Sequence, residues 1–403
     1  MRTQVIINWG ISSFYGWGVY GLNLALQWIN DPNIHPICSR TIRSEDIQID
    51  PLRKKLFQLV LDDSRNFDNQ LREHIKTNSH VQVDVPLLMP LGDDFVGLPT
   101  LYNNPITGIP NIGVTFFENG DLSEAAVQRA KEYPWIVTGS SWNEKILRQR
   151  GINRVSTILQ GVDTTLFHPA PRSGLFGDRF LMFSGGKLEF RKGQDLVLEA
   201  AAQFTRKYPD AILVTAWHSP WPQTAKSMRA SPRVGSVPLT KEGNLDTPGW
   251  ARQAGIPDGQ FLDLGAVPNS QLPPILREMD VGIFPNRCEG GTNLVAMECM
   301  ACGVPVILSA NTGHLDIATE DNCYRLYHQS RVPHQEGFAQ GLLDWGESSV
   351  AELLEHLETI YHDRVGARQV GSLASQFMSQ MTWKKTADAL RQVVVDQTSD
   401  NLN

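Results

Sequence analysis

Cysteine is scarce in this sequence. The five cysteines, Cys38, Cys288, Cys299, Cys302 and Cys323, are odd in number and scattered along 403 residues. They therefore form no disulfide framework, and they indicate a reducing compartment, which we expect to be the cytoplasm. Cys299 and Cys302 form a C-x-x-C pair, but no second pair or histidine cluster accompanies them. We interpret them as small residues on a packed helix, and we expect no metal site.

Long apolar runs are missing as well. No run reaches the length of about 18 apolar residues that a membrane-spanning helix needs, so we expect no such helix. The opening MRTQVIINWG lacks the basic and long apolar regions of a signal peptide. The net charge is −7, which disfavours binding to nucleic acid or to anionic lipid by bulk electrostatics. Peripheral contact with a membrane stays open.

What the chain does have is an ordinary globular composition, with 41% hydrophobic and 20% charged residues. Its length suits two domains, in which short apolar runs alternate with helix-length segments. In the first half, strands are predicted over 5–7, 82–88, 112–117, 135–138 and 154–159, and helices over 20–28, 123–133 and 142–149. In the second half, strands are predicted over 180–184, 211–216, 261–264, 281–285 and 304–308, and a helix over 194–208. This alternation predicts an α/β fold with two parallel-sheet domains.

A stretch rich in proline and glycine, residues 168–178, separates the two halves. We therefore expect an N-terminal domain over 1–170, a second domain over 171–380 and a C-terminal segment over 381–403. The last segment holds an amphipathic stretch, Trp383–Val395, which predicts a docking helix. Residues 219–250 are rich in Pro, Ser and Gly, which predicts a long insertion loop.

The first motif that could carry chemistry reads GGKLEFRKG over residues 185–193, between a predicted strand and a predicted helix. Cations around a glycine turn at the carboxyl end of a strand suit a diphosphate, and the following helix N-terminus adds partial positive charge. The alternative interpretation, an exposed basic turn, is common and stays open.

The second motif reads CEGGTNLVAME over residues 288–298 and follows the predicted strand 281–285. Gly290 and Gly291 allow backbone amides to approach a ligand, and Thr292 is the predicted N-cap of a helix that ends at Gly303. Glu298 lies among apolar neighbours, and a carboxylate there could accept hydrogen bonds from two vicinal hydroxyls, as a ribose requires. A solvent-facing glutamate is the alternative.

Together these motifs resemble the retaining glycosyltransferases of family 4, which have the GT-B fold. The family pattern of a glycine, a following basic residue, and a later lysine and glycine is met by Gly186, Lys187, Lys192 and Gly193. The family helix that reads EAMACG is similar to residues 298–303, and further similar stretches are 160–169, 311–317 and Trp383 with Ala387. The resemblance implies two Rossmann-like domains that face a central cleft, with a C-terminal helix that returns to the first domain.

The resemblance also implies a function. This is the metal-independent transfer, with retention, of a hexose-type sugar from a nucleoside-diphosphate sugar to a hydroxyl of a carbohydrate, glycolipid or glycopeptide, without a cofactor. Lys187 and Lys192 would bind the donor diphosphate and stabilise the leaving group. Glu298 would hold the ribose, and Glu289 would contact the donor sugar. Residues whose backbone would approach the donor are Gly290, Gly291, Thr292 and Asn293, together with Gly16 and Gly18 of the first domain.

Two departures from the family pattern concern acidic residues. The family has seven residues between its two glutamates, whereas eight separate Glu289 from Glu298. Either a bulge absorbs the extra residue, or Glu289 does not superpose on the family's first glutamate. In addition, the strand 112–117 is not followed by the histidine that many members carry there. Glu118 is our candidate for acceptor positioning or proton acceptance, with an ordinary loop carboxylate as the alternative; His80 and His218 are weaker candidates.

Two other function classes stay open. One is a GT-B scaffold that binds a glycan or nucleotide without turnover. The other is an NAD-dependent oxidoreductase, because Gly16, Gly18 and Gly21 have the spacing of a dinucleotide-binding motif. These glycines lie well past the first strand and no acidic residue ends the next stretch, which disfavours the oxidoreductase.

Overall fold

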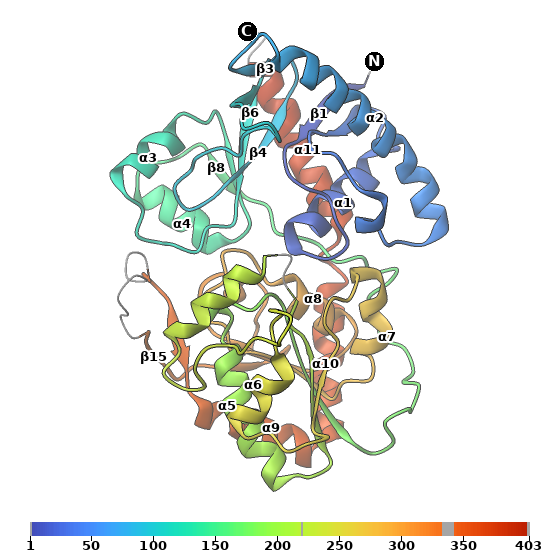
Figure 1. Cartoon of the computed structure of the whole chain (residues 1–403), viewed down its shortest axis with the longest axis vertical. Coiled ribbons are helices and arrows are strands. Elements are labelled where there is room, and N and C mark those ends of the chain that lie inside the picture. Colours follow the sequence, from blue (N-terminus) through green and yellow to red (C-terminus); the bar gives the residue numbers. More distant parts are fainter. Residues whose placement is uncertain (1, 219–220, 333–341, 401–403) are drawn as a thin grey trace. The chain divides into compact units, whose positions relative to one another are not determined.

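The computed structural model describes residues 2–218, 221–332 and 342–400. These residues form two compact units, which Figure 1 shows as ribbons. The first unit comprises Met1–Gly161, Pro268–Ser270 and Met381–Asn403, and the second comprises Val162–Val267 and Gln271–Gln380. The division after Gly161 lies somewhat before residue 170, where the sequence predicted a boundary.

The first unit is built on a parallel six-stranded sheet in the order β2-β1-β4-β6-β7-β8. These strands are β1 (Thr3–Ile7), β2 (Ile34–Cys38), β4 (Leu87–Leu91), β6 (Asn111–Thr115), β7 (Ile136–Thr138) and β8 (Val155–Thr157). The helices of this unit are α1 (Gly16–Trp28), α2 (Pro51–Ile75), α3 (Glu124–Lys131), α4 (Ser141–Gln149) and α11 (Trp383–Asp400). The central strand β4, LLMPL, reads as an unbroken apolar run because a parallel sheet is buried on both faces.

The second unit repeats this plan with a parallel sheet in the order β11-β10-β9-β12-β13-β14. The strands are β9 (Phe180–Gly185), β10 (Ala211–Ala216), β11 (Phe261–Asp263), β12 (Val281–Phe284), β13 (Val306–Ser309) and β14 (Tyr324–Leu326). The helices are α5 (Gln194–Lys207), α6 (Thr247–Ala254), α7 (Leu272–Leu276), α8 (Leu294–Ala301), α9 (Val350–His362) and α10 (Arg364–Met378). Helix α5 packs on α6 and α9, and α8 packs on α10 (Figure 1). The predicted α/β class with two parallel sheets is confirmed.

Some predicted elements differ in their bounds. The first helix begins at Gly16 rather than at residue 20, so Gly16 and Gly18 lie in a helical turn and not in a loop. The predicted strand 82–88 is two strands, β3 (Val81–Val83) and β4, because Pro86 precedes β4 and lacks the N–H that a continuous strand would need. Strand β3 pairs with β5 (Ile106–Gly108) in a separate small sheet.

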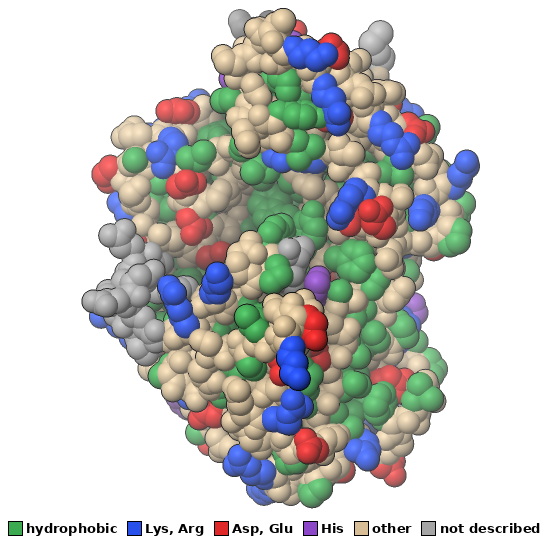
Figure 2. Space-filling view, viewed as in Figure 1, with side chains coloured by type: hydrophobic (Ala, Val, Ile, Leu, Met, Phe, Trp, Pro, Cys, Tyr) green, Lys and Arg blue, Asp and Glu red, His purple; other side chains and the backbone are tan. Residues whose placement is uncertain are grey.

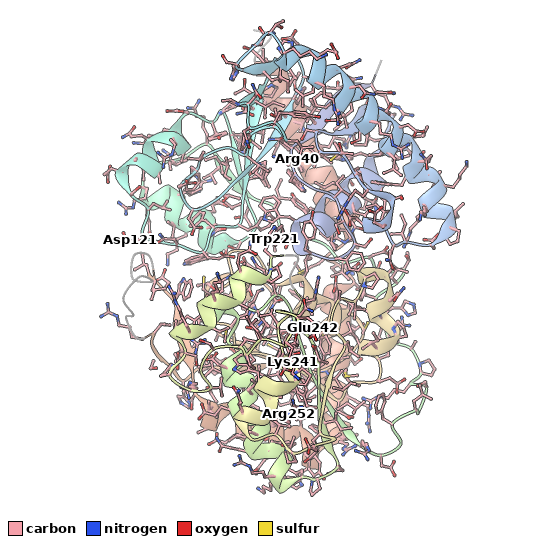
Figure 3. The ribbon with its side chains drawn as sticks, in the orientation of Figure 1. Arg40, Asp121, Trp221, Lys241, Glu242 and Arg252 are labelled. Carbon is pink, nitrogen blue, oxygen red and sulfur yellow. The ribbon has the colours of Figure 1, made fainter. Side chains whose placement is uncertain are left out.

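The predicted insertion loop is also partly wrong. Residues 219 and 220 lie outside the described residues, but beyond them a 3₁₀ segment runs over Pro222–Ala230 and α6 begins at Thr247. Trp250 is fully buried in α6, whereas Trp221, labelled in Figure 3, is 41% exposed. Each helical segment has a proline in its first turn, where proline favours helix initiation. The prediction of a loop considered only how many prolines the segment has and not where they stand.

Several helices and strands were not predicted from the sequence. The largest is α2, whose buried residues are Phe57, Val60, Leu61, Ser64, Asp68 and Leu71. Their spacing of three and four residues is that of an amphipathic helix, so the signal was present in the sequence. Strand β14, helices α9 and α10, and a hairpin of β15 (Gln329–Arg331) and β16 (Gly346–Ser348) were also missed.

Among the described residues, no helix combines the length and the apolar character that crossing a membrane requires. Figure 2 shows basic and acidic side chains interspersed over the visible face. This mixture agrees with the modest negative net charge of −7 and gives that face no extended field of one sign.

Candidate functional site

The two sequence motifs follow neighbouring strands of the second sheet. The turn that begins at Gly186 follows β9, the loop that carries Glu289 follows β12, and these strands pair in parallel. Gly193 has φ +69°, and a Cβ on it would collide with the carbonyl oxygen of Pro285. A glycine is therefore needed for the turn to pass this close to the end of β12. The carboxyl edge of a parallel sheet is where α/β domains usually bind ligands.

Five charged side chains of these two segments form a connected series of ion pairs, in which each side chain contacts the next. Lys187 Nζ lies 2.7 Å from Glu189 Oε1, and Glu189 Oε2 lies 2.9 Å from Arg191 Nε. Arg191 Nη1 donates to Glu289 Oε2 at 3.2 Å, and Lys192 Nζ donates to Glu289 Oε1 at 2.5 Å. We call the series Lys187, Glu189, Arg191, Glu289 and Lys192 the ion-pair chain.

Glu289 is an ionised and well-bonded carboxylate. Burial by itself would raise the pKa of Glu289, but Lys192 and Arg191 outweigh burial and lower this pKa to about 2. The Asn286 amide also donates to Oε1, and the Glu289 backbone N–H donates to Thr312 Oγ1 at 2.8 Å. Both carboxylate oxygens thus accept from cations, which suits charge balance and positioning better than proton transfer.

Lys192 is held close to the glycine turn. A Cβ built on Gly186, which has φ +115°, would lie 3.9 Å from Lys192 Cε. Burial lowers the pKa of Lys192, and the neighbouring Glu289 opposes this shift. The side chain of Lys192 is 12% exposed, whereas that of Lys187 is 34% exposed. The turn therefore presents one sheltered and one more open ammonium group.

The loop after β12 that carries Glu289, which we call the acidic loop, leads into α8. The N-cap residue of α8 differs from the predicted one. Asn293, not Thr292, is the N-cap of α8: its backbone has φ 64° and its side chain accepts from the N–H of Ala296. Asparagine tolerates the left-handed conformation far better than the β-branched threonine, which explains the difference. The hydroxyl of Thr292 instead lies 3.0 Å from Met297 Sδ.

His314 supports this cap from the turn after β13. Its Nδ1 lies 3.2 Å from the carbonyl oxygen of Ser309, which can only accept, so Nδ1 carries the proton. Its Nε2 then accepts from Asn293 Nδ2 at 3.2 Å. Burial lowers the pKa of His314 to about 4, so this histidine is neutral at physiological pH. It lies in the quoted stretch 311–317, but the sequence analysis gave it no role.

A second residue that the sequence analysis missed is Arg287, which is fully buried. It donates to both oxygens of Asp195 in α5 at 2.9 and 2.7 Å, and to Glu347 in β16 at 2.8 Å. It also donates to the carbonyl oxygen of Phe190. Arg287 thus ties the basic turn to α5 and β16, and an arginine directly after an apolar strand was the available signal.

The remaining predicted residues of the second unit lie in α8 or beside it. Glu298 is buried in α8, which excludes the solvent-facing alternative. Cys299 and Cys302 are buried too, and burial raises the pKa of both thiols, that of Cys302 to about 12. Over the described ranges, no group of three His, Cys, Asp or Glu side chains is placed to hold a metal ion. His218, the weaker candidate, is exposed at the end of β10.

Four candidates lie in the first unit: Gly16, Gly18, Glu118 and His80. Glu118 follows β6 and is half-buried, and its backbone N–H donates to Asp93 Oδ1 at 3.0 Å. His80 is exposed and lies 3.0 Å from the hydroxyl of Thr107. A Cβ on Gly21 would lie 2.7 Å from Trp9 Nε1. Gly18 and Gly21 thus serve the packing of α1, which weakens the support for a dinucleotide-binding motif.

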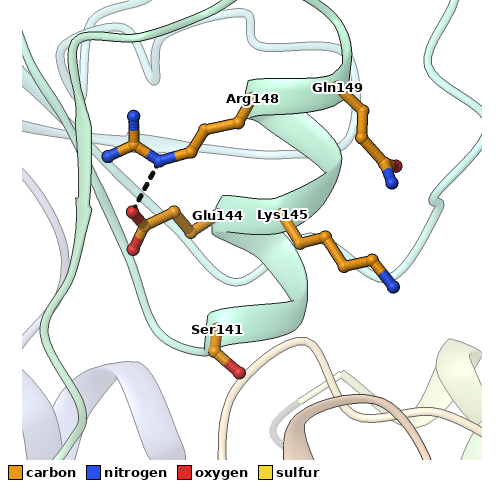
Figure 4. A pocket seen from close by; sticks show the side chains of 5 residues that line it. All are labelled: Ser141, Glu144, Lys145, Arg148 and Gln149. Atoms are coloured by element: carbon orange, nitrogen blue, oxygen red, sulfur yellow. Dashed lines mark hydrogen bonds and ion pairs between the residues drawn. The ribbon is translucent and has the colours of Figure 1, made fainter.

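The first unit also has a hollow of 530 Å³ along α4, shown in Figure 4. It is lined by Ser141, Glu144, Lys145, Arg148 and Gln149. Glu144 pairs with Arg148 at 2.8 Å and accepts from the hydroxyl of Thr157 at 2.6 Å. The bond to Thr157 attaches α4 to β8, so we interpret the charged pair as structural.

The sequence is similar to those of known proteins. The family Glycosyl transferases group 1 matches residues 170–358. A D-inositol 3-phosphate glycosyltransferase of Segniliparus rotundus is 26% identical over 59% of this chain and 46% of its own length. A GDP-mannose-dependent alpha-(1-6)-phosphatidylinositol monomannoside mannosyltransferase of Mycolicibacterium smegmatis is 29% identical over 38% of this chain and 37% of its own. The chain thus spans about half, or less, of the curated relatives it matches.

Solved structures resemble the whole chain at low identity. Sucrose-phosphate synthase of Thermosynechococcus elongatus matches 99% of this chain and 100% of its own, with a TM-score of 0.66 and 16% identity. HepE of Anabaena, solved in complex with UDP-glucose, matches 99% of this chain and 100% of its own, with a TM-score of 0.61 and 13% identity. These likenesses confirm the GT-B fold that the sequence resemblance implied. Residues 170–358, which lie in the second unit apart from 268–270, thus form a Glycosyl transferases group 1 domain.

Proposed function

We propose that the chain is a retaining glycosyltransferase that moves a hexose-type sugar from a nucleoside-diphosphate sugar to a hydroxyl acceptor. The observation that carries this proposal is the position of Lys187 and Lys192 at the carboxyl end of β9, beside the acidic loop after β12. The family match covers this unit. Relatives named as a glycosyltransferase and a GDP-mannose-dependent mannosyltransferase, and a structural neighbour in complex with UDP-glucose, support the substrate class.

In the proposed reaction the two lysines stabilise the negative charge of the leaving group. As the bond between the anomeric carbon and the donor phosphate oxygen breaks, negative charge builds on the leaving diphosphate. Lys187 and Lys192 stabilise this charge as preorganised cations, in the way a divalent metal does in other transferases. The acceptor oxygen bonds to the same face of the sugar, and its proton passes to a donor phosphate oxygen. No protein base is required at that step, which accords with the fully engaged carboxylate of Glu289.

Other side chains would orient the donor. Glu298 would accept hydrogen bonds from the ribose hydroxyls, and Glu289 would contact the sugar while it holds Lys192. The backbone of the acidic loop, with Gly290, Gly291, Thr292 and Asn293, would surround phosphate and sugar. The roles of Gly16, Gly18 and Glu118 on the first unit stay predictions, as does the choice among carbohydrate, glycolipid and glycopeptide acceptors.

The test begins with binding. Calorimetry with UDP, GDP and NAD should show tight binding of one nucleoside diphosphate and weak or no binding of NAD. Transfer from the matching sugar nucleotides to a panel of sugar acceptors should then be detectable. Binding without transfer or donor hydrolysis would favour a silent scaffold, and preferential binding of NAD would favour the oxidoreductase.

Substitution of the lysines tests the mechanism. Lys187→Ala and Lys192→Ala should each reduce turnover by about 10²–10³, the usual loss when one preorganised charge donor is removed. Lys207→Ala is the matched control, because Lys207 is exposed on α5 and its ammonium group pairs with Glu358 of α9, outside the ion-pair chain. Equal turnover in the wild type and in both Lys187→Ala and Lys192→Ala would contradict the proposed role of the two lysines.

A further inference from the structure

The proposed function gives roles to Lys187 and Lys192 but none to Arg191, which lies between them in the sequence. Its side chain is 9% exposed, so it is an unusually sheltered cation. Its guanidinium contacts one oxygen of each of two carboxylates: Nε lies 2.9 Å from Glu189 Oε2, and Nη1 lies 3.2 Å from Glu289 Oε2. Arg191 therefore joins the two acidic side chains of the ion-pair chain.

The second oxygen of each glutamate contacts a lysine. Glu189 Oε1 lies 2.7 Å from Lys187 Nζ, and Glu289 Oε1 lies 2.5 Å from Lys192 Nζ. The two ammonium groups that would grip a diphosphate thus stand at the ends of the ion-pair chain, with Arg191 at its centre. We propose that Arg191 is a positioning residue, which sets the places of both lysines through the two glutamates. This proposal rests on the proposed function of the site.

The chemistry of the side chain explains why an arginine is needed at the centre. A guanidinium is planar and has several N–H donors at fixed angles, so it can hold two carboxylates at once. An ammonium group is a single point of charge on a flexible stem. Each glutamate, held by Arg191 at one oxygen, presents its other oxygen to a lysine in a fixed place; in Glu289 that other oxygen also accepts from the Asn286 amide. The long lysine side chains are then ordered before a ligand arrives, which lowers the entropic cost of binding.

Charge balance gives Arg191 a second effect. The ion-pair chain has three positive and two negative side chains, so it carries one net positive charge. Without Arg191 the two glutamates would cancel the two lysines, and the attraction for a diphosphate would fall. Both carboxylates remain ionised: burial would raise the pKa of Glu189, but Arg191 and Lys187 outweigh it and lower that pKa.

The backbone of Arg191 is held independently of its side chain. Its carbonyl oxygen accepts from the N–H of Arg287 at 2.7 Å, and that of Cys288 lies at 3.4 Å. A substitution at residue 191 leaves these bonds in place, so the turn keeps its attachment to the acidic loop. The expected change is therefore confined to contacts of the side chain, which include a hydrogen bond from Nη1 to the carbonyl oxygen of Cys288 at 3.4 Å.

The discriminating experiment compares Arg191→Lys with Arg191→Gln. Arg191→Lys keeps the positive charge but loses the planar group that can hold two carboxylates at once. A role in positioning therefore predicts that this variant does not bind the nucleotide as tightly as the wild type. We expect Arg191→Lys to raise the Kd for whichever of UDP and GDP the wild type binds about tenfold, and Arg191→Gln about a hundredfold. The KM for the sugar nucleotide should rise and kcat should fall in both. Arg172→Lys is the control, because Arg172 pairs with the buried Asp280 in the same unit but outside the ion-pair chain.

A double-mutant cycle tests whether Arg191 acts through the lysines. Lys192→Ala should cost much less affinity in the Arg191→Lys background than in the wild type, because residues that act as one unit are not additive. Additive losses would overturn the proposal, as would an Arg191→Lys chain that binds as tightly as the wild type.

Glu189→Gln provides a route that leaves Arg191 and Glu289 in place, should both variants at residue 191 fail to fold. It removes the ion pairs of Glu189 with Lys187 and Arg191, but it leaves those of Glu289 with Arg191 and Lys192. Lys187→Ala should then have little further effect on the Kd, whereas Lys192→Ala should keep its full effect. Equal further losses from both lysines would overturn the proposal. A wild-type chain that binds neither UDP nor GDP overturns the proposed function and this inference together; wild-type binding with unchanged variants overturns only the inference.

Discussion

Single side chains beside the acidic loop are held in one ionisation state by their surroundings. His314 is the clearest case, because it is fully buried and uses both ring nitrogens to join Ser309 and Asn293. The charged groups that face it are Glu289, Lys192 and Arg191. Protonation at Nε2 would place a donor against the Asn293 amide N–H and weaken the cap of α8.

This geometry predicts how stability depends on pH. The pKa of His314 is lowered from 6.5 to about 4, so between these values the unfolded chain binds a proton that the folded chain does not. Stability should therefore fall as the pH decreases from 6.5 to about 4, by roughly 3 kcal/mol from this group. Urea unfolding of the wild type and of His314→Gln, at about pH 7 and about pH 5, should show a smaller loss in the variant.

Glu289 does not affect this comparison, because its contribution to stability changes only in a lower pH range. Its pKa is lowered from 4.5 to about 2, so the stability it contributes is lost only as the pH falls below 4.5. His74→Gln, a change at an exposed histidine in α2, should keep the wild-type pH dependence. An identical slope in the wild type and His314→Gln would show that His314 is not the group responsible.

At the scale of elements, helix α1 shows how packing decides where an element begins. The sequence predicted that the first helix begins at residue 20, but α1 starts at Gly16. Gly18 is required by contact: a Cβ on it would lie 2.7 Å from the backbone nitrogen of Ser12. A Cβ on Gly16 would meet nothing within 4 Å. Two glycines of one motif therefore have different physical reasons to be there.

The two glycines should respond to alanine with opposite signs. Gly18→Ala forces α1 away from the backbone of Ser12 and should lower the free energy of unfolding by about 1–3 kcal/mol. Gly16→Ala should leave it unchanged or raise it by up to about 1 kcal/mol, because alanine has the higher helix propensity. Urea unfolding monitored by circular dichroism measures both. Equal destabilisation by the two variants would mean that the backbone contact is not the cause.

At the scale of the whole molecule, the end of the chain completes the first unit. Residues 381–403 belong to that unit, and α11 packs on α1. Trp28 Nε1 donates to the carbonyl oxygen of Ala387 at 3.2 Å, and Thr386 Oγ1 donates to that of Leu159 at 2.9 Å. The buried side chains of α11 are Trp383, Ala387, Leu390 and Val394. The predicted docking helix thus contacts residues of the first unit that lie 227 and 359 positions away in the sequence.

Removal of this helix should destabilise the first unit. A chain that ends at Gln380 loses three large buried apolar side chains, each worth about 1.5–3 kcal/mol, so its unfolding should require several kcal/mol less free energy. Tryptophan fluorescence in urea should show an earlier transition. A chain that ends at Asp396 is the control, because residues 397–399 are not buried. Equal stability of the two truncated chains would contradict this role of α11.

The sequence by itself determined the features that are local in the chain. Apolar runs predicted most strands of both sheets, because a buried parallel strand needs no more than a few consecutive apolar residues. The spacing of Lys187, Lys192, Glu289 and Glu298 also identified the segments that make up the candidate site. These signals need only neighbours in sequence, and they sufficed for the fold class and the family.

Tertiary structure decided how these segments meet. Arg191 and Glu289 are separated by 98 positions, and they touch because β9 and β12 are adjacent in the sheet. The same adjacency makes Arg287 a buried link to Asp195. His314, 21 positions after Asn293, likewise supports the cap of α8 only in the folded chain. Such contacts depend on distances between residues that are far apart in the sequence, and only the packed sheet sets those distances.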